Sequence, residues 1–233
     1  MSGMIIKYPT QHWSGEYNWI DDTALVKSDI DTRYFIELDI INRIKENKMG
    51  YFDFNKNLVD IGANFGGYSM LLDFKNNYCF EGNKRFACML YANMLIKDKY
   101  ANTEVYNCVL SDKVEEIGYN GWCCEGCGSP DEVRGDLYSD MHKVKTSVLD
   151  SFGLTDVGLI KIDVEGFEEK VLRGGIGTIV RNNYPPILFE CWDVGYYNMT
   201  QEKHDSMFNF LRGLGYKIIE YWGDFETHLA IHK

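Results

Sequence analysis

The sequence predicts an α/β fold built on an open β-sheet. A short apolar run at 58–61 leads into a glycine-rich turn and then into a helical segment, an order that builds a nucleotide crevice at the carboxyl ends of parallel strands. Carboxylates lie at or just past the ends of five predicted strands, and we expect them to converge on that crevice. They are Asp60, Glu81, Asp112, Asp163 and Glu190.

The composition is that of one globular domain. The chain has 233 residues, of which 45% are hydrophobic and 25% charged, and its formal net charge is −11. This charge disfavours nucleic acid and anionic membranes as partners. We expect no membrane span and no signal peptide, because no apolar run approaches the required length of about 20 residues. Seven cysteines, an odd number, favour reduced thiols and a cytoplasmic setting. No feature fixes an oligomeric state.

The first quarter of the chain carries no motif. Residues 1–56 are predicted to form an N-terminal extension and a helix packed on a domain at 57–233, with residues 1–30 as a flap. Residues 32–48 are predicted to be that helix, since four isoleucines share one face and Gly50 follows its end. The isoleucines are Ile36, Ile40, Ile41 and Ile44.

The turn after the first strand indicates which nucleotide is bound. A dinucleotide fingerprint reads G-x-G-x-x-G, and Asn64 replaces its second glycine. Asp60 stands just before the turn, where its charge would disfavour a pyrophosphate. S-adenosylmethionine fits better, because it has no phosphate and carries a sulfonium and an ammonium group that a carboxylate can hold. The alternatives are a tight turn without a ligand and a dinucleotide-dependent oxidoreductase.

The next two strands supply candidates for the nucleoside. Residues 78–81 are predicted as a strand ending at Glu81, where an acid accepts hydrogen bonds from both ribose hydroxyls; the alternative is a surface glutamate. A helix at 83–96 and a strand at 104–110 follow. Asp112, preceded by Ser111, lies where an adenine amino group could bind, although a turn-capping role fits as well.

Residues 113–143 are predicted to be an irregular, glycine-rich substrate or lid loop. Trp122 could be a stacking surface there. The spacing of Cys124 and Cys127 invites a zinc site, but a structural zinc needs four ligands in paired spacing. We therefore interpret both residues, and the adjacent Cys123, as reduced thiols.

The last part of the chain is predicted to complete the sheet and its helices. The expected elements are a short strand or connection at 145–149, a strand at 158–163, a helix from Glu165 that stops at Gly174, a strand at 186–190, a helix from Thr200 to Leu214, and a hairpin of strands at 216–222 and 226–232.

Four stretches resemble the FkbM-type methyltransferases, a family of S-adenosylmethionine-dependent enzymes. They are VDIGANFGGYS at 59–69, FEGN at 80–83, LDSFGLTDVGLIKIDVEGFEEKVLRGG at 149–175 and PILFE at 186–190. The IKIDVEG segment and the residues after it are the specific signal. One departure is Gly82, where the family often has proline.

The resemblance implies a Rossmann-like class I methyltransferase fold, with a seven-stranded, mostly parallel sheet, an antiparallel last strand and helices on both faces. It also implies methyl transfer from S-adenosylmethionine to oxygen, with S-adenosylhomocysteine as the product. The cofactor-binding positions carried over are Asp60, Gly62, Ala63, Asn64, Tyr68, Ser69, Glu81, Ser111 and Asp112.

Methyl transfer to a hydroxyl needs a positioned acceptor and a base. Asp163, which the resemblance places near the methyl group, is the first candidate, and Glu165 or Glu190 is the second. Asp163 could instead cap the following helix. Lys161 shares a strand face with Asp163 and could steady it or pair with Glu190. A divalent ion held by these carboxylates is possible, but nothing in the spacing demands one.

We expect the acceptor to be a neutral sugar or glycan hydroxyl, since family members methylate sugars, glycans and small natural products. Trp192, Tyr196 and Tyr197 could stack on a sugar face, although packing in the core is the commoner role for such rings. The alternatives are a non-sugar acceptor and a non-catalytic module that binds S-adenosylmethionine. Methylation of nitrogen or of RNA fits the acidic surface less well.

Overall fold

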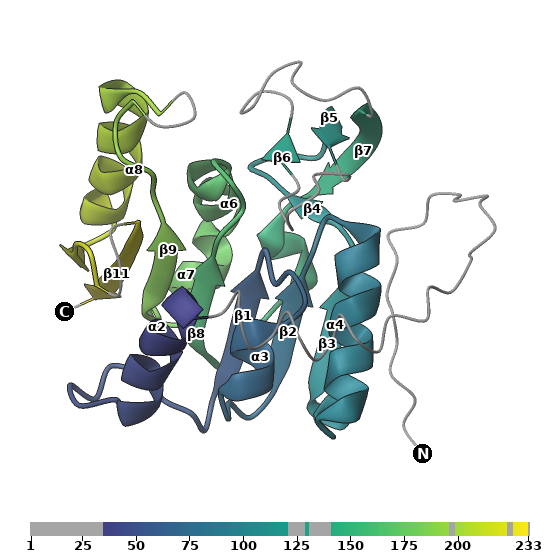
Figure 1. The fold of residues 1–233 in the computed structure, drawn as a ribbon. Coiled ribbons are helices and arrows are strands. Elements are labelled where there is room, and N and C mark those ends of the chain that lie inside the picture. The colour runs from purple at the N-terminus through teal and green to yellow at the C-terminus, as the bar shows by residue number, and fades with distance from the viewer. Residues whose placement is uncertain (1–34, 121–128, 131–140, 196–198, 223–225, 233) are drawn as a thin grey trace.

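The computed structural model describes residues 35–120, 129–130, 141–195, 199–222 and 226–232. A seven-stranded sheet in the order β10–β11–β9–β8–β1–β2–β3 forms its centre (Figure 1). The strands are β1 (Asn57–Ile61), β2 (Asn77–Phe80), β3 (Thr103–Tyr106), β8 (Val157–Ile162), β9 (Ile187–Glu190), β10 (Tyr216–Ile219) and β11 (Thr227–His232).

The direction of the strands confirms the predicted fold class. The pairs that join β3, β2, β1, β8 and β9 are all parallel. The last strand, β11, runs antiparallel to both of its neighbours, β9 and β10. The carboxyl ends of the five parallel strands therefore lie at one edge of the sheet.

Helices cover both faces of the sheet (Figure 1). One face packs against α2 (Phe35–Glu46), α3 (Gly67–Leu71) and α4 (Lys84–Ile96), and the other against α6 (Glu168–Gly174), α7 (Ile176–Arg181) and α8 (Gln201–Gly213). The alternation of side chains along each strand feeds both cores: Leu58 points toward α2, whereas Val59 and Ile61 belong to the core on the side of α6 and α8.

The predicted helices at 32–48, 83–96 and 200–214 are present, with small changes at their ends. Ile40, Ile41 and Ile44 of α2 are buried against the sheet, as the spacing predicted. The N-caps of α4 and α8 explain where these helices begin. Asn83 accepts a hydrogen bond from Arg85 N, and Thr200 accepts one from Lys203 N. The expected flap at 1–30 lies outside the described residues.

A second, four-stranded sheet corrects the prediction of an irregular loop at 113–143. Its strands are β4 (Val109–Leu110), β5 (Glu116–Asn120), β6 (Ser129–Pro130) and β7 (Met141–Ser147), in the order β4–β7–β5–β6. It stands at the carboxyl edge of the main sheet (Figure 1). The pairing of β5 with β7 joins residues that are far apart in the sequence. Gly118 interrupts the alternation of polar and apolar side chains in β5, so the local pattern does not indicate a strand.

The predicted strand at 104–110 is also divided, between β3 and β4. The side-chain amide of Asn107 donates hydrogen bonds to the carbonyl oxygens of Glu81 (2.8 Å) and Gly82 (3.0 Å), which ends the pairing of β3 with β2. The chain then turns away, and Val109 and Leu110 pair with β7 instead. This turn carries residues 108–110 over the edge of the main sheet.

Candidate active site

The turn between β1 and α3 lets the main sheet form a site at its carboxyl edge. Gly62, Asn64 and Gly66 all have left-handed backbone conformations, with φ of 69°, 52° and 88°. A methyl group on Gly62 would overlap the carbonyl oxygen of Asp163. Only glycine therefore allows the ends of β1 and β8 to approach this closely.

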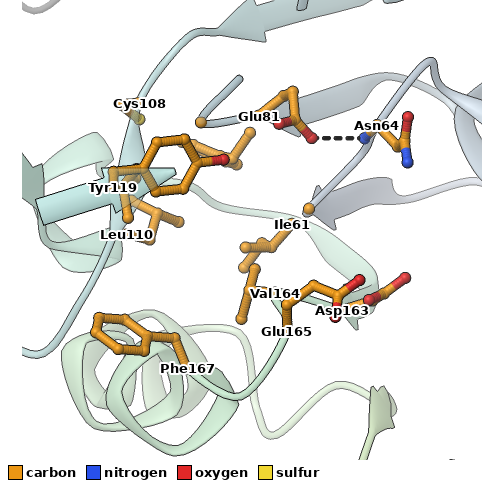
Figure 2. A pocket seen from close by; sticks show the side chains of 14 residues that line it. Ile61, Asn64, Glu81, Cys108, Leu110, Tyr119, Asp163, Val164, Glu165 and Phe167 are labelled. Carbon is orange, nitrogen blue, oxygen red and sulfur yellow. Dashed lines mark hydrogen bonds between the residues drawn. The ribbon is translucent and has the colours of Figure 1, made fainter. Parts of the chain in front are cut away.

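A pocket opens at this edge (Figure 2). Its walls come from the ends of β1, β2 and β8 and from the second sheet. The lining residues are Ile61, Gly62, Asn64, Phe80, Glu81, Gly82, Cys108, Val109, Leu110, Tyr119, Asp163, Val164, Glu165 and Phe167. Figure 2 shows Glu81 on the opposite side of the pocket from Asp163 and Glu165. The pocket thus combines apolar walls with carboxylates at two separate places, as expected for a small polar ligand with an apolar ring.

Glu81, the residue predicted to bind the ribose, directly follows β2 and lines the pocket. Its carboxylate accepts hydrogen bonds from Asn64 N (2.8 Å) and Asn83 N (2.7 Å). Burial raises its pKa to about 7, against the opposing effect of these two N–H groups. Glu81 therefore ties the glycine turn to the start of α4, and its side chain still lines the pocket.

Asp60 is fully buried beneath the turn and is not among the residues that line the pocket. Its Oδ2 accepts a hydrogen bond from Ser69 Oγ at 2.6 Å, and its Oδ1 lies 3.9 Å from Lys161 Nζ. Burial raises the pKa of Asp60, while Lys161 and Ser69 act in the opposite direction. The structure thus places Asp60 and Ser69 in the support of the turn.

Lys161 connects the turn to the predicted base. Its Nζ donates hydrogen bonds to the carbonyl oxygen of Gly62 (2.8 Å) and to Asp163 Oδ2 (3.2 Å). This contact agrees with the prediction that Lys161 steadies Asp163. The lysine is 5% exposed and lies over the buried ring of Tyr68, so Tyr68 also supports the turn from below.

The helix predicted to open at Glu165 begins three residues later, because the preceding residues form a tight turn. Glu165 and Gly166 have φ of 58° and 99°, which no α-helix contains. Glu168, at the start of α6, accepts hydrogen bonds from Val164 N and Gly166 N. Asp163 is therefore not the cap of this helix, and its side chain faces the pocket beside Glu165 (Figure 2).

Glu168 is a site-supporting residue to which the sequence analysis assigned no role. It is 3% exposed, and burial raises its pKa to about 7. The signal in the sequence was an acid two residues after a glycine at a strand end, a pattern too short to distinguish from a first-turn glutamate.

Glu190 ends β9, next to the same group of acids. Its Oε2 atom is buried and has no hydrogen-bond partner among the described residues. Burial raises its pKa well above the usual value, and the charges of Asp163, Glu168 and Glu165 add to this shift. A buried carboxylate oxygen without a hydrogen bond is costly, so Glu190 is a candidate for a functional group, although it is not among the residues that line the pocket.

Like Asp60, Tyr68 and Ser69, three further predicted cofactor residues do not line the pocket. Ser111 is fully buried, Asp112 is exposed, and neither lines the pocket. Their backbone packs so closely on α6 that a methyl group at Gly174 would overlap Ser111 O. The pocket wall at this place is formed by 108–110. Ala63 is buried in the core under α4.

Several expected features fall outside the described residues. They are Trp122, Cys123, Cys124, Cys127, Tyr196 and Tyr197. Trp192 is described and is buried with Ile117 and Phe167, so it packs in the core. Within the described ranges, no group of three or more His, Cys, Asp or Glu side chains is arranged to hold a metal ion. No helix in that same part of the chain is long and apolar enough to cross a membrane.

Comparison with solved structures agrees with the topology. An FkbM methyltransferase from Methylobacillus flagellatus KT aligns with a TM-score of 0.54 and 17% identity, over 78% of this chain and 44% of the other. The chain thus spans less than half of that relative. A protein from Staphylococcus aureus, named as a caffeoyl-CoA O-methyltransferase, aligns with a TM-score of 0.51 and 14% identity, over 88% and 93% of the two chains.

The third structure is named as an S-adenosyl-L-methionine-dependent methyltransferase from Methanococcus maripaludis, with a TM-score of 0.50, 15% identity and coverage of 95% and 97%. No curated protein matches the sequence. The methyltransferase FkbM domain matches residues 60–218, which include the glycine turn, Glu81, Asp163 and Glu190. The chain therefore belongs to the FkbM methyltransferase family, as its motifs had indicated.

Proposed function

We propose that this methyltransferase transfers a methyl group from S-adenosylmethionine to a hydroxyl group of a sugar or glycan. The observation that carries the proposal is the pocket between Glu81 and Asp163 at the carboxyl edge of the main sheet. The glycine turn allows the ends of β1 and β8 to approach each other there. No Lys or Arg side chain lines this pocket, among the residues described, which suits a cofactor without phosphate.

The residues present fit the cofactor. Glu81 offers carboxylate oxygens to two ribose hydroxyls, and the apolar residues 108–110 offer a wall for an adenine ring. Glu165, on the opposite side, suits the cationic methionine end. When bound, S-adenosylmethionine supplies a methyl group that is already activated toward a nucleophile.

The chain's own residues then have to position the acceptor hydroxyl and take its proton. Lys161 Nζ donates a hydrogen bond to Asp163 Oδ2, which holds this carboxylate beside the pocket. Glu190 lies next to it with an oxygen that accepts no bond from the described residues. We assign proton removal to this pair of acids, because Asp163 faces the pocket and the raised pKa of Glu190 suits a base that works near neutral pH.

The acidic surroundings support a neutral acceptor rich in hydroxyl groups. Carboxylates accept hydrogen bonds from hydroxyls but repel phosphates, and Asp163, Glu165 and Glu190 lie together at this edge. A non-sugar natural product with several hydroxyls would satisfy the same groups. The acceptor screen described next separates these two classes.

The test is incubation of the protein with isotopically labelled S-adenosylmethionine and a panel of neutral glycans, phosphorylated sugars and polyhydroxylated small molecules, followed by mass analysis. Label in a neutral glycan, bound as an ether, supports the proposal. Label only in a non-sugar acceptor, or on nitrogen, rejects the sugar assignment. Cofactor binding without turnover on any acceptor class would favour a non-catalytic binding module.

A further inference from the structure

An aromatic ring from the second sheet stands in the pocket, and the sequence analysis gave it no role. Tyr119 of β5 is 6% exposed and lines the pocket together with Glu81 and Leu110. In Figure 2 its ring extends from the second sheet toward the side where Glu81 lies. The main sheet thus forms the floor of the pocket, and the second sheet contributes a side wall.

The orientation of Tyr119 follows from the alternation of β5. Ile117, two residues earlier, faces the same way and is buried against Phe167 and Trp192. The opposite face of the second sheet carries an ion pair, in which Lys143 Nζ lies 3.0 Å from Glu116 Oε1. The buried contact of Ile117 and the charged outer face together keep Tyr119 directed inward.

Gly82 provides the space that the ring occupies. A methyl group on Gly82 would lie 2.8 Å from Tyr119 Oη and 2.8 Å from Val109 Cγ2, which is closer than carbon atoms normally approach. Any larger residue at this position would displace the ring or the strand that carries it. The glycine in FEGN, where related sequences often have proline, therefore has a steric partner in this chain.

We propose that Tyr119 contacts the nucleoside part of the cofactor, and that Gly82 is the small residue that admits its ring. This inference rests on the proposed function, because it requires the adenosine to lie beside Glu81. A tyrosine ring offers a flat apolar face to a purine or ribose, and such stacking typically strengthens binding about tenfold or more. Tyr119 is thus a specificity-determining residue supplied by the second sheet.

The test is calorimetric binding of S-adenosylhomocysteine and of 5′-methylthioadenosine, which lacks the amino-acid end. Tyr119→Ala is expected to weaken both ligands by the same factor, about tenfold or more. Tyr119→Phe keeps the ring and should stay within about threefold of the wild type. Lys143→Ala, on the outer face of the same sheet, is the matched control and should leave both affinities unchanged.

The role of Gly82 is tested by a double-mutant cycle. Gly82→Ala is expected to weaken binding in the wild-type background and to cost less in the Tyr119→Ala background, because the contact with the ring has then been lost and only the contact with Val109 Cγ2 remains. An equal loss in both backgrounds would overturn the steric link. Thermal unfolding identifies folded variants, and Tyr119→Leu, which keeps bulk without a flat ring, replaces Tyr119→Ala if that variant does not fold.

The outcomes separate the inference from the proposed function. If wild-type protein binds both ligands and Tyr119→Ala binds them equally well, Tyr119 does not contact the nucleoside and the inference is wrong. A loss for S-adenosylhomocysteine alone would place the ring at the methionine end and would also overturn it. If wild-type protein binds neither ligand, the proposed cofactor itself is rejected.

Discussion

Asp163 and Glu190 lie at the ends of the neighbouring strands β8 and β9, and their carboxyl groups have different surroundings. Asp163 Oδ2 accepts a hydrogen bond from the buried ammonium group of Lys161. Glu190 has a buried oxygen without a partner in the described chain and lies among other acids, which favours its protonated form. A titratable group whose pKa is shifted by burial and by neighbouring charges is a candidate for a functional residue, which supports a role for Glu190.

Asp163→Asn is expected to leave the affinity for S-adenosylhomocysteine within a fewfold of the wild type and to lower kcat by about 100-fold or more, because Asn cannot take up or hold a proton. Calorimetry and a turnover assay measure the two effects. Asp156→Asn changes an exposed aspartate just before the same strand and is the matched control. Near-normal turnover of Asp163→Asn would remove Asp163 from the mechanism.

Glu190→Gln is expected to raise the melting temperature at pH 8 by a few degrees and to change it little at pH 5. The raised pKa means that the charged carboxylate is disfavoured in the folded protein, so a neutral isostere relieves this cost only where Glu190 would ionise. Scanning calorimetry of the protein without ligand at both pH values makes the comparison. Equal shifts at pH 5 and pH 8 would contradict the assigned electrostatic cause.

At the scale of elements, the turn after β1 is the part that tolerates least change. Gly62→Ala is expected to reduce the free energy of unfolding by roughly 2–4 kcal/mol, because the new methyl overlaps the Asp163 carbonyl in addition to straining a positive φ. Gly50→Ala is the matched control. Its φ of 67° is similar, but no atom lies within 4 Å of the added methyl.

Urea unfolding measures both glycine variants. Gly50→Ala should reduce the free energy of unfolding by only about 1 kcal/mol, which is the cost of the positive φ alone. Equal reductions in the free energy of unfolding for the two variants would show that the close contact between the ends of β1 and β8 does not determine the cost of Gly62→Ala.

The sequence patterns predicted the helices and strands that are defined by local residue order. They did not predict the elements whose boundaries depend on contacts between distant parts of the chain. The strand ends at Glu81 and Asp163 were predictable because each follows a short apolar run. The second sheet was not, since the register between β5 and β7 depends on pairing across more than 20 residues. Ser111 and Asp112 were predicted at the adenine end because the third strand was expected to reach residue 110. β3 instead ends at Tyr106, where the Asn107 amide donates hydrogen bonds to the carbonyl oxygens of Glu81 and Gly82, contacts that a local pattern does not show.

The start of α6 was missed for a related reason. The positive φ of Glu165 is uncommon for a residue with a side chain, and Glu168 stabilises the turn by accepting two backbone N–H groups. The sequence shows that an acid is present, but it does not show from which backbone N–H groups that acid accepts hydrogen bonds. Of the five strand-end acids predicted to converge on the crevice, Glu81 and Asp163 line the pocket, whereas Asp60, Asp112 and Glu190 are not among its lining residues.

For the whole molecule, pH should act through buried acids. The pKa values of Glu81 and Glu168 are both about 7 in the folded protein, above the ordinary 4.5. Between these values the folded state binds more protons than the unfolded chain, so stability is highest below about pH 4.5 for these groups and falls as pH rises to about 7. Repulsion within a chain of net charge −11 acts in the same direction.

Glu168→Gln is expected to flatten this decline by about 1–3 kcal/mol between pH 5 and pH 8. Glu202→Gln removes the same charge from an exposed position on α8 and should leave the slope nearly as in the wild type. Denaturant unfolding of the ligand-free protein across this range gives both slopes. Parallel curves for Glu168→Gln and the wild type would show that burial of Glu168 does not govern the pH response.

The hydrogen bonds of Lys161 have a mechanical consequence. One ammonium group holds the carbonyl oxygen of Gly62 and the carboxylate of Asp163, while Gly62 itself touches the Asp163 backbone. In the proposed reaction, the turn that would receive the cofactor and the acid that would face the acceptor are thus held by the same ammonium group. A displacement of either one stretches its hydrogen bond to that group, so we expect cofactor binding at the turn to bear on the position of Asp163.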